Sequence, residues 1–307
     1  MKEILIFGHK NPDTDSICSS IVKQILNEKN GKTDSQAVRL GNINKETEFV
    51  LNYLGIEAPE LVEKVEEGQK VLLVDHNEFN QSVEGIENAK IIGVVDHHRI
   101  SNFQTAEPLY YTARPYGCTA TILYKDFVEK GLTIDKKEAI LMASAIISDT
   151  LLLKSPTTTS HDKEALEKLA EIAGIDYNVY GLDMLKAGTD LSSFSTEEIL
   201  SLDAKRIDLK EVKSIIAQVN TASIENVMEM QADIKEKMQE KIAAEGLDLF
   251  MFLITDIVNS NSQVIALGNS AKVVEKAYNV TLENDTALLT GVVSRKKQVV
   301  PIMTENA

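Results

Sequence analysis

The first segment of the chain sets a pattern that the rest repeats, and it reads Ile4-Leu5-Ile6-Phe7-Gly8-His9-Lys10-Asn11-Pro12-Asp13-Thr14-Asp15. Its first four residues are apolar, which predicts a buried strand, and the polar residues after Gly8 predict a turn. Residues 16–28 then carry apolar side chains at helical spacing. A strand, a turn and a helix in this order form the first half of a βαβ unit, whose strands are parallel.

The same alternation continues through the first two-thirds of the chain. It predicts strands at residues 4–7, 37–40, 71–74 and 91–95, and helices at residues 16–28, 45–54, 118–131, 136–152 and 161–173. We therefore expect an α/β fold whose N-terminal domain is a doubly wound, mostly parallel sheet.

A change of composition at residues 188–195, which read Gly-Thr-Asp-Leu-Ser-Ser-Phe-Ser, marks the predicted domain boundary. We expect an N-terminal domain over residues 1–188, a hinge linker over 189–195, and a smaller α/β domain with a mixed sheet over 196–307. The last domain is predicted to have helices at residues 196–204, 224–244 and 270–278, strands at 206–209, 214–219, 249–257 and 264–267, and a final strand pair within 287–302. The long helix at 224–244 could bind a partner helix, but covering one face of the sheet is the favoured interpretation.

Charge and composition exclude several classes of protein. The chain has 32 Lys and Arg against 47 Asp and Glu, a formal net charge of −15, which disfavours binding to nucleic acid. No apolar stretch approaches the ~20 residues that a membrane span needs, so we expect no membrane partner. Cys18 and Cys118 lie in apolar patterns, which indicates buried thiols in a reducing compartment, and the cytoplasm is the expected location.

Histidines and aspartates gather where the predicted strands end. His9 and Asp13 follow the first strand, Asp75 follows a later one, and Asp96-His97-His98 follows the next. Ligands of open parallel sheets bind at the carboxyl ends of the strands, so these residues can converge although they are distant in sequence. Asp149 adds a carboxylate near the end of an otherwise apolar helix.

Each of these residues alone has an ordinary structural interpretation. Asp13 or Asp15 could cap a helix, His76 or His98 could be a hydrogen-bonded core imidazole, and Asp149 could pair with a lysine. Together they indicate metal ions, because several carboxylates in one crevice keep their charge only with cations between them. Mixed imidazole and carboxylate ligands suit Mn²⁺, Zn²⁺, Co²⁺ or Fe²⁺, and a bridged pair of such ions suits phosphoryl transfer or hydrolysis.

A basic cluster, Arg295-Lys296-Lys297, lies between two apolar runs near the C-terminus. It is either a solvated hairpin tip or a clamp for phosphate groups. Lys205 by itself is typical of a surface lysine.

Taken jointly, these motifs resemble the DHH phosphoesterase superfamily and, within it, the family II, manganese-dependent inorganic pyrophosphatases. The resemblance rests on the histidines and aspartates above and extends to residues 114–119, 155–159 and 294–298. It implies two Mn²⁺ ions per subunit, with Asp75 as a bridge between them. One ion would be held by His9, Asp13 and Asp75, and the other by Asp15, Asp75, His97 and Asp149.

The resemblance also implies the reaction and its other participants. A metal-bridging hydroxide would hydrolyse pyrophosphate to two phosphates, further Mg²⁺ would enter with the substrate, and Co²⁺ could replace Mn²⁺. The catalytic and substrate-binding residues would be His98, Lys205, Arg295 and Lys296. The active site would lie at the domain interface, where the C-terminal, DHHA2-type domain closes its basic loop on the substrate, and the chain would form a homodimer through its N-terminal domain.

Two other functions stay open on the sequence. A DHH phosphodiesterase or exopolyphosphatase would act on short oligonucleotides or polyphosphate, but such relatives typically carry a Gly-Gly-Gly-His motif that this sequence lacks. Loss of a ligand would favour a non-catalytic metal-binding scaffold, but every matching ligand position is filled.

Overall fold

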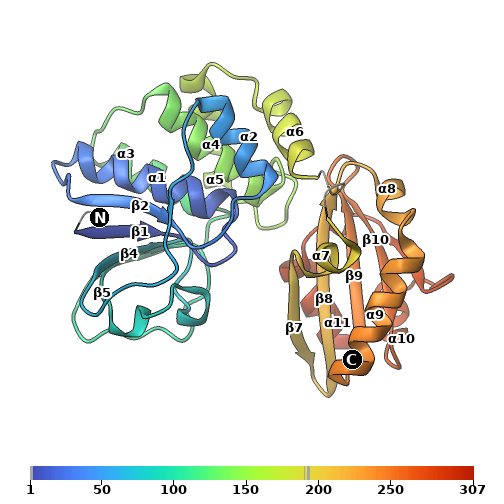
Figure 1. Cartoon of the computed structure of the whole chain (residues 1–307). Helices are drawn as coiled ribbons and strands as arrows, with labels where there is room; N and C mark the ends of the chain where they lie inside the picture. The colour runs from blue at the N-terminus through green and yellow to red at the C-terminus, as the bar shows by residue number, and fades with distance from the viewer. Residues whose placement is uncertain (1–2, 190, 192–193) are drawn as a thin grey trace. The chain divides into compact units, whose positions relative to one another are not determined.

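The computed structural model describes residues 3–189, 191 and 194–307. The chain divides into two compact units, Met1–Ala187 and Gly188–Ala307, each with its own sheet (Figure 1). The predicted hinge at 189–195 includes residues 190, 192 and 193, which lie outside the described residues.

The first unit is built on a six-stranded parallel sheet with the strand order β3-β2-β1-β4-β5-β6. Its strands are β1 (Ile4–Phe7), β2 (Ser35–Arg39), β3 (Glu60–Leu61), β4 (Lys70–Val74), β5 (Lys90–Asp96) and β6 (Tyr110–Ala113). The strand order reverses between β1 and β4, and ligands of such sheets bind outside the carboxyl ends of the strands at the reversal. The predicted parallel α/β sheet is therefore confirmed, and its topology favours a site after β1 and β4.

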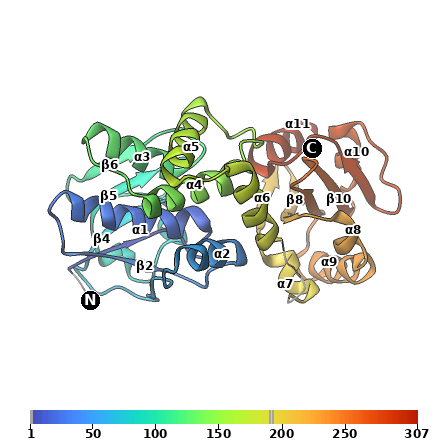
Figure 2. The same cartoon turned by 90° about the horizontal axis from the view of Figure 1, so that it is seen from above.

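Helices cover the first sheet and pack on one another (Figure 2). They are α1 (Thr14–Lys29), α2 (Lys45–Leu54), α3 (Thr119–Glu129), α4 (Lys136–Thr150), α5 (Ser160–Ala173) and α6 (Tyr177–Gly188). Elsewhere on the sheet, Leu5 and Phe7 of β1 and Leu73 of β4 pack against Val62 and Val83, which come from loops. None of the helices in the described part of the chain combines the length and apolar character that crossing a bilayer requires.

Two predicted helices of this unit are too long, and two strands and one helix were not predicted. The helix predicted at 118–131 is α3, which ends at Glu129. The sequence predicts a helix to residue 152, but α4 ends at Thr150 and Leu151, Leu152 and Leu153 have φ of +48°, +54° and +64°. Leu152 packs closely on Gly181 of α6, so a tertiary contact overrides the helical preference of leucine. The strands β3 and β6 and the helix α6 are additions to the predicted elements.

The second unit has a five-stranded mixed sheet with the strand order β11-β10-β9-β8-β7, in which β8 and β9 are parallel and the other pairs antiparallel. Its strands are β7 (Ala204–Leu209), β8 (Val212–Thr221), β9 (Leu249–Asp256), β10 (Asn261–Leu267) and β11 (Thr286–Leu289). One face is covered by α7 (Thr196–Ser201), α8 (Ile224–Met228) and α9 (Gln231–Glu245), and the other by α10 (Lys272–Tyr278) and α11 (Val300–Asn306). The predicted mixed sheet is confirmed.

The predicted final strand pair within 287–302 is wrong. Only β11 is a strand, and Arg295–Val299 forms a π-helical turn that leads into α11. Pro301 explains the difference, because proline cannot donate to a strand ladder but is tolerated in the first turn of a helix. The basic cluster therefore precedes a helix instead of forming a hairpin tip.

Two predicted helices of this unit also differ from the structure. The helix predicted at 196–204 ends at Ser201, and Ala204 already belongs to β7. The helix predicted at 224–244 is the pair α8 and α9, since Met230, which packs against the core, leaves the helical conformation between them.

Candidate metal centre

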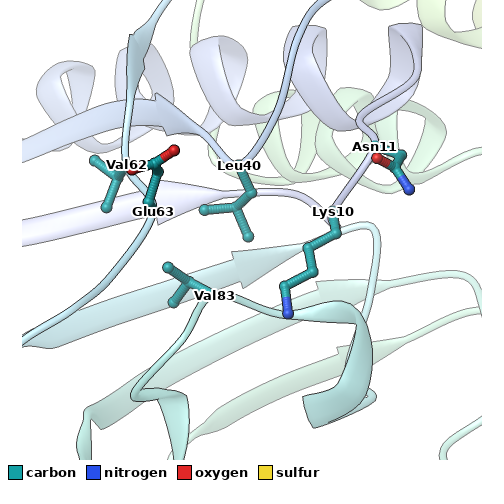
Figure 3. Close-up of a pocket in the computed structure, with 6 residues that line it drawn as sticks. All are labelled: Lys10, Asn11, Leu40, Val62, Glu63 and Val83. Carbon is teal, nitrogen blue, oxygen red and sulfur yellow. The ribbon is translucent and has the colours of Figure 1, made fainter.

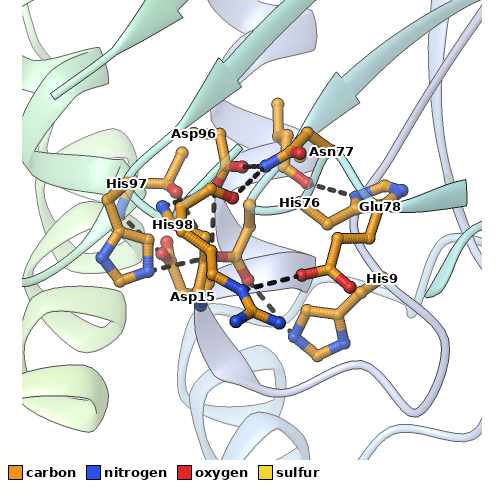
Figure 4. A network of polar contacts seen from close by, with 12 residues as sticks. His9, Asp15, His76, Asn77, Glu78, Asp96, His97 and His98 are labelled. Carbon is orange, nitrogen blue, oxygen red and sulfur yellow. Dashed lines mark hydrogen bonds and ion pairs between the residues drawn. The ribbon is translucent and has the colours of Figure 1, made fainter. Parts of the chain in front are cut away.

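The predicted metal ligands lie in the loops after β1, β4 and β5 and in helices α1 and α4 of the first unit. Figure 4 labels three of them, His9, Asp15 and His97. The full set is His9, Asp13, Asp15, Asp75, His97 and Asp149. Their donor atoms form two groups, in each of which the atoms lie within 4.8 Å of one another: His9 with Asp13 and Asp75, and Asp15 with Asp75, His97 and Asp149. Asp75 is common to both groups.

Asp75 lies between two histidines and offers each a different oxygen. Its Oδ2 is 3.5 Å from Nε2 of His9, and its Oδ1 is 3.3 Å from Nε2 of His97. The Oγ of Ser16 donates a hydrogen bond to Oδ2 at 2.7 Å and helps to fix the carboxylate. The backbone of Asp75 has a φ of +58°, a conformation that costs energy outside glycine and clusters at functional sites. This placement is the one that a bridging carboxylate needs.

The two histidines present the same ring nitrogen to the carboxylates. Nδ1 of His9 lies 2.8 Å from the carbonyl oxygen of Lys10, and Nδ1 of His97 lies 3.1 Å from that of Tyr116. A carbonyl oxygen only accepts, so Nδ1 carries the hydrogen in both rings. When the ring is neutral, Nε2 therefore has a free lone pair, the state in which histidine binds a metal.

Asp13 and Asp15 are held by backbone N–H groups and keep their place in the cluster. Oδ1 of Asp13 accepts from the N–H of Ser16 at 2.9 Å and caps α1, while Oδ2 lies 3.3 Å from Nε2 of His9. Asp15 is fully buried and accepts from the N–H groups of Thr119 and Ala120 in the first turn of α3. The capping interpretation of Asp13 and the ligand interpretation are thus compatible, because they use different oxygens.

The buried carboxylates repel one another strongly. Burial raises the pKa of Asp149 well above its usual value, and the charges of Asp15, Asp13 and Asp75 raise it further. Burial and the charge of Asp75 raise the pKa of Asp15 to about 7. Burial also acts to raise the pKa of Asp75, but the hydrogen bond with His97 and the charges of the nearby histidines hold it well below its usual value.

The histidines of the cluster are basic because the aspartates surround them. Burial lowers the pKa of His9, but the charge and hydrogen bond of Asp13 and the charge of Asp75 outweigh it and raise the pKa to about 10. Burial likewise lowers the pKa of His97, but its contacts with Asp75 and Asp15 raise it to about 9. Divalent cations would replace these protons, so the mixed donor set fits the Mn²⁺, Zn²⁺, Co²⁺ or Fe²⁺ pair that the sequence predicts.

His98 is oriented by a buried carboxylate that belongs to neither metal group. Oδ1 of Asp96 lies 3.0 Å from both the backbone nitrogen and Nδ1 of His98, and its Oδ2 accepts from Nδ2 of Asn77 at 2.6 Å. Burial would raise the pKa of Asp96, but these hydrogen bonds lower it, so the ionised carboxylate accepts from Nδ1. The neighbouring His76 is a hydrogen-bonded core imidazole, because its ring contacts the carbonyl oxygen of Val74 and Oγ of Ser82. Nε2 of His98 is not used in these contacts, and the His98 side chain is 39% exposed.

Two buried or half-buried carboxylates that support the cluster were missed by sequence reasoning. Glu46 in α2 accepts hydrogen bonds from Oγ1 of Thr14 and Oγ of Ser148, and each of these neighbours a predicted ligand in sequence. Asp162 in α5 accepts from the N–H of Gly117 and from Oγ1 of Thr121, and so fixes the loop before α3. Thr159 and Asp162 have the spacing of a capping box, which indicates the N-terminus of α5. This spacing does not indicate the contacts of Asp162 with the loop before α3.

The predicted substrate-binding cations of the second unit come from two separate elements. Lys205 is exposed in β7, and Arg295 and Lys296 lie in the turn before α11. The guanidinium of Arg295 contacts Asp203, two residues before Lys205, and Ile216, which pairs with Lys205 across β7 and β8. The second unit therefore brings Arg295 to the part of the chain that carries Lys205.

A pocket of about 230 Å³ opens beside the loop after β1 (Figure 3). It is lined by Lys10, Asn11, Leu40, Val62, Glu63 and Val83. The predicted ligands are not part of this lining among the described residues, so the pocket is separate from the carboxylate and histidine cluster.

Comparisons with known proteins agree over the full chain. The family model described as "DHH family, N-terminal domain" matches residues 3–146, and the one described as "DHHA2 domain" matches residues 182–306. The chain is 55% identical over 306 residues to the manganese-dependent inorganic pyrophosphatase of Bacillus subtilis (strain 168), and the match covers 99% of each chain. It is 56% identical over 306 residues, again 99% of each chain, to a protein of Bacillus pumilus (strain SAFR-032) named probable manganese-dependent inorganic pyrophosphatase.

Solved structures give the same picture of the fold. A Methanococcus jannaschii protein described as a "putative family II inorganic pyrophosphatase" is 42% identical, with a TM-score of 0.81 over 99% of each chain. An exopolyphosphatase-related protein from Bacteroides fragilis is 11% identical, with a TM-score of 0.50 over 99% of this chain and 91% of that one. The second likeness shows a shared fold alone.

Proposed function

The chain belongs to the DHH family and, within it, to the manganese-dependent inorganic pyrophosphatases, and from this premise we propose that it hydrolyses inorganic pyrophosphate to two phosphates at the cluster around Asp75. The observation that carries the proposal is the position of Asp75, whose two oxygens face His9 and His97 separately. A carboxylate placed in this way suits two cations that lie a few ångströms apart.

In this proposal two Mn²⁺ ions per subunit are held, one by each group of ligands. His9, Asp13 and Asp75 hold the first, and Asp15, Asp75, His97 and Asp149 hold the second. When bound, such ions supply Lewis acidity toward phosphoryl oxygens and lower the pKa of water. The four aspartates balance the charge of two divalent ions, which leaves the basic side chains to meet the anionic substrate.

The remaining site residues bind the substrate and hold a proton. His98, anchored through Nδ1 to Asp96, keeps Nε2 available to donate a proton to the leaving phosphate. Lys205, Arg295 and Lys296 bind the phosphate groups as cations, and Arg295 adds the fork geometry that matches two oxygens. The basic loop of the second unit closes on the substrate in this proposal, which would exclude water only when substrate is present.

Further parts of the proposal concern the ions and the assembly. Co²⁺ can substitute for Mn²⁺ in this proposal, and additional Mg²⁺ enters with the substrate. The chain forms a homodimer through its first unit, a proposal supported by the edge strand β6, where Tyr110 is 87% exposed. Light scattering of the Mn²⁺-loaded protein tests the dimer, and a monomer would contradict it.

The cytoplasmic location stays a prediction, consistent with Cys18 and Cys118 being buried thiols.

The experiment that tests the activity measures phosphate release from chelator-stripped protein given pyrophosphate and Mg²⁺, with and without preincubation in Mn²⁺. A dinucleotide and a short polyphosphate serve as competing substrates. Release that requires Mn²⁺ or Co²⁺ and is fastest with pyrophosphate is the expected result. Cleavage of the dinucleotide or polyphosphate with little turnover of pyrophosphate would favour a DHH phosphodiesterase or exopolyphosphatase instead.

A further inference from the structure

Arg295 is anchored to Asp203 inside the second unit. Its Nη1 donates to the backbone carbonyl oxygens of Asp203 at 2.6 Å and of Ile216 at 3.3 Å, and its Nη2 donates to Oδ1 of Asp203 at 2.7 Å. The Arg295 side chain is 10% exposed, whereas that of Asp203 is 51% exposed. A long, flexible side chain is thus held in one position by three acceptors.

These contacts leave one edge of the guanidinium unused. An arginine has five N–H donors, and the contacts use both hydrogens of Nη1 and one hydrogen of Nη2. Nε and the second hydrogen of Nη2 have no acceptor among the described residues. Among the described residues, the buried side-chain atoms that lack a partner are Oη of Tyr111 and Oγ1 of Thr158. Nε of Arg295 is not one of them, so this unused donor is not a buried atom. The unused N–H groups point in the same direction, the arrangement that binds two oxygens of one phosphate group.

We propose that Asp203 is a positioning residue, which holds one edge of Arg295 so that the Nε and Nη2 edge binds a phosphate group of the substrate. The inference rests on the proposed function, because that function makes Arg295 a substrate-binding residue. The benefit is conformational: an arginine that is already ordered loses less rotamer freedom when the substrate binds. The negative charge of Asp203 acts in the opposite direction, since near an anionic substrate it would by itself weaken binding.

This opposition between charge and geometry makes the proposal testable by steady-state kinetics with pyrophosphate on the full-length, Mn²⁺-loaded protein. Asp203→Ala removes the side-chain acceptor, and Asp203→Asn keeps an oxygen but removes the charge. We expect Asp203→Ala to raise KM about tenfold, as the loss of a charge-assisted hydrogen bond would, and Asp203→Asn to raise it less. The matched control is Asp208→Ala, which removes an exposed carboxylate from β7 and should leave KM within about twofold.

A double-mutant cycle separates positioning from a general loss of structure. If Asp203 acts through Arg295, Asp203→Ala should change KM by less than about twofold in an Arg295→Ala background. An unchanged or lowered KM in Asp203→Ala, or effects that multiply in the double variant, would overturn the proposal. If Asp203→Ala fails to fold, as judged by circular dichroism, Asp203→Asn decides, and an unchanged or lowered KM for it overturns the proposal.

Failure of the underlying function gives a different result. Wild-type protein that does not hydrolyse pyrophosphate with Mn²⁺ contradicts the proposed function, and Arg295→Ala with normal KM and kcat contradicts the role of Arg295. Either result also overturns the inference about Asp203, because that inference depends on the proposed function and on the role of Arg295. A large loss in Arg295→Ala together with normal kinetics in Asp203→Ala overturns the inference alone.

Discussion

The backbone N–H of Thr119 donates a hydrogen bond to Oδ2 of Asp15 at 2.7 Å, across 104 residues of sequence. The first turn of α3 therefore holds a predicted metal-binding carboxylate of α1. The N–H groups at this helix end have no partner within the helix, and together with the helix dipole they favour the charged form of Asp15. Burial and the charge of Asp75 act in the opposite direction and raise its pKa. The position of Asp15 thus depends on the loop that leads into α3.

Removing Asp162 should loosen that loop. Asp162 is fully buried and accepts from the N–H of Gly117 at 2.9 Å and from Oγ1 of Thr121 at 2.6 Å. Asp162→Ala leaves these donors without a partner, so we expect the free energy of unfolding to fall by about 3 kcal/mol. We also expect Mn²⁺ affinity to fall about tenfold, because the loop supports Asp15. Chemical denaturation and Mn²⁺ titration measure the two effects.

The control for Asp162 lies on the same helix. Glu164 pairs with Lys125 at the surface and is 59% exposed, so Glu164→Ala should leave the free energy of unfolding essentially unchanged. Similar losses in both variants would mean that the loop contacts of Asp162 contribute nothing of their own.

Asp75→Asn should abolish the proposed two-ion site while it preserves the shape of the side chain. The amide loses the negative charge and one of the two oxygens that face His9 and His97. We expect the rate of pyrophosphate hydrolysis to fall by more than ~100-fold. Even mutation of residues that only hydrogen-bond to metal ligands typically lowers activity by up to about 100-fold. Elemental analysis of the desalted protein should find less than one Mn²⁺ per chain. Two retained ions would contradict a bridging role.

Glu46 should act on metal binding through hydrogen bonds. Its Oε1 accepts from Oγ1 of Thr14 at 2.6 Å and from Oγ of Ser148 at 2.5 Å, and so ties together two segments that carry predicted ligands. Glu46→Ala should lower Mn²⁺ affinity about tenfold, and Glu46→Gln, which keeps an acceptor oxygen, should retain most of it. Glu48→Ala removes an exposed partner of Lys45 from the same helix and should have no effect. A loss in Glu46→Gln equal to that in Glu46→Ala would indicate that charge, not position, matters.

Mn²⁺ binding should release protons and strengthen as pH rises. Without metal, His9 and His97 have pKa values of about 10 and about 9, so both rings are protonated near neutral pH. A metal ion needs the neutral ring and displaces these protons, and raising the pH lowers the cost of that displacement. Calorimetric titrations in buffers of different ionisation enthalpy count the protons released. A binding enthalpy that does not depend on the buffer would contradict the prediction.

His98→Gln should slow turnover and leave the metal centre intact. His98 is held by Asp96 and is not one of the predicted metal ligands, so both ions should remain bound. Loss of a general acid typically costs about 10²-fold in kcat, and the acidic limb of the pH–rate profile should change. A variant with an unchanged acidic limb would show that another group protonates the leaving phosphate.

The sequence predicted the elements that carry strong periodicity and missed those that depend on distant contacts. The strands β1, β2, β4 and β5 are apolar runs bounded by turns, and they were located to within about two residues, whereas the edge strands β3 and β6 were missed. The helix α6 was missed because its position depends on distant contacts. These are a hydrogen bond between Tyr180 and Ser144 and the contact of Gly181 with Leu152. The end of the chain was misassigned although Pro301 was a local signal for a helix start.

The identity of the metal-binding groups was accessible because parallel strands place their following residues at one edge of the sheet. His9, Asp75 and His97 could therefore be grouped from strand positions and residue type alone. The supporting carboxylates Glu46 and Asp162 could not be found in this way, since nothing in their local sequence indicates which distant hydroxyl or N–H they accept from.

Local sequence was thus enough to show which chemical groups follow each strand, because side-chain type and hydrophobic periodicity are properties of short segments. The folded chain was needed to show how those groups face one another. The oxygens of Asp75 are directed by contacts with Ser16, 59 residues away, and the guanidinium of Arg295 is directed by Asp203, 92 residues away. Such orientations arise from the packing of segments that are distant in sequence, and no local pattern encodes them.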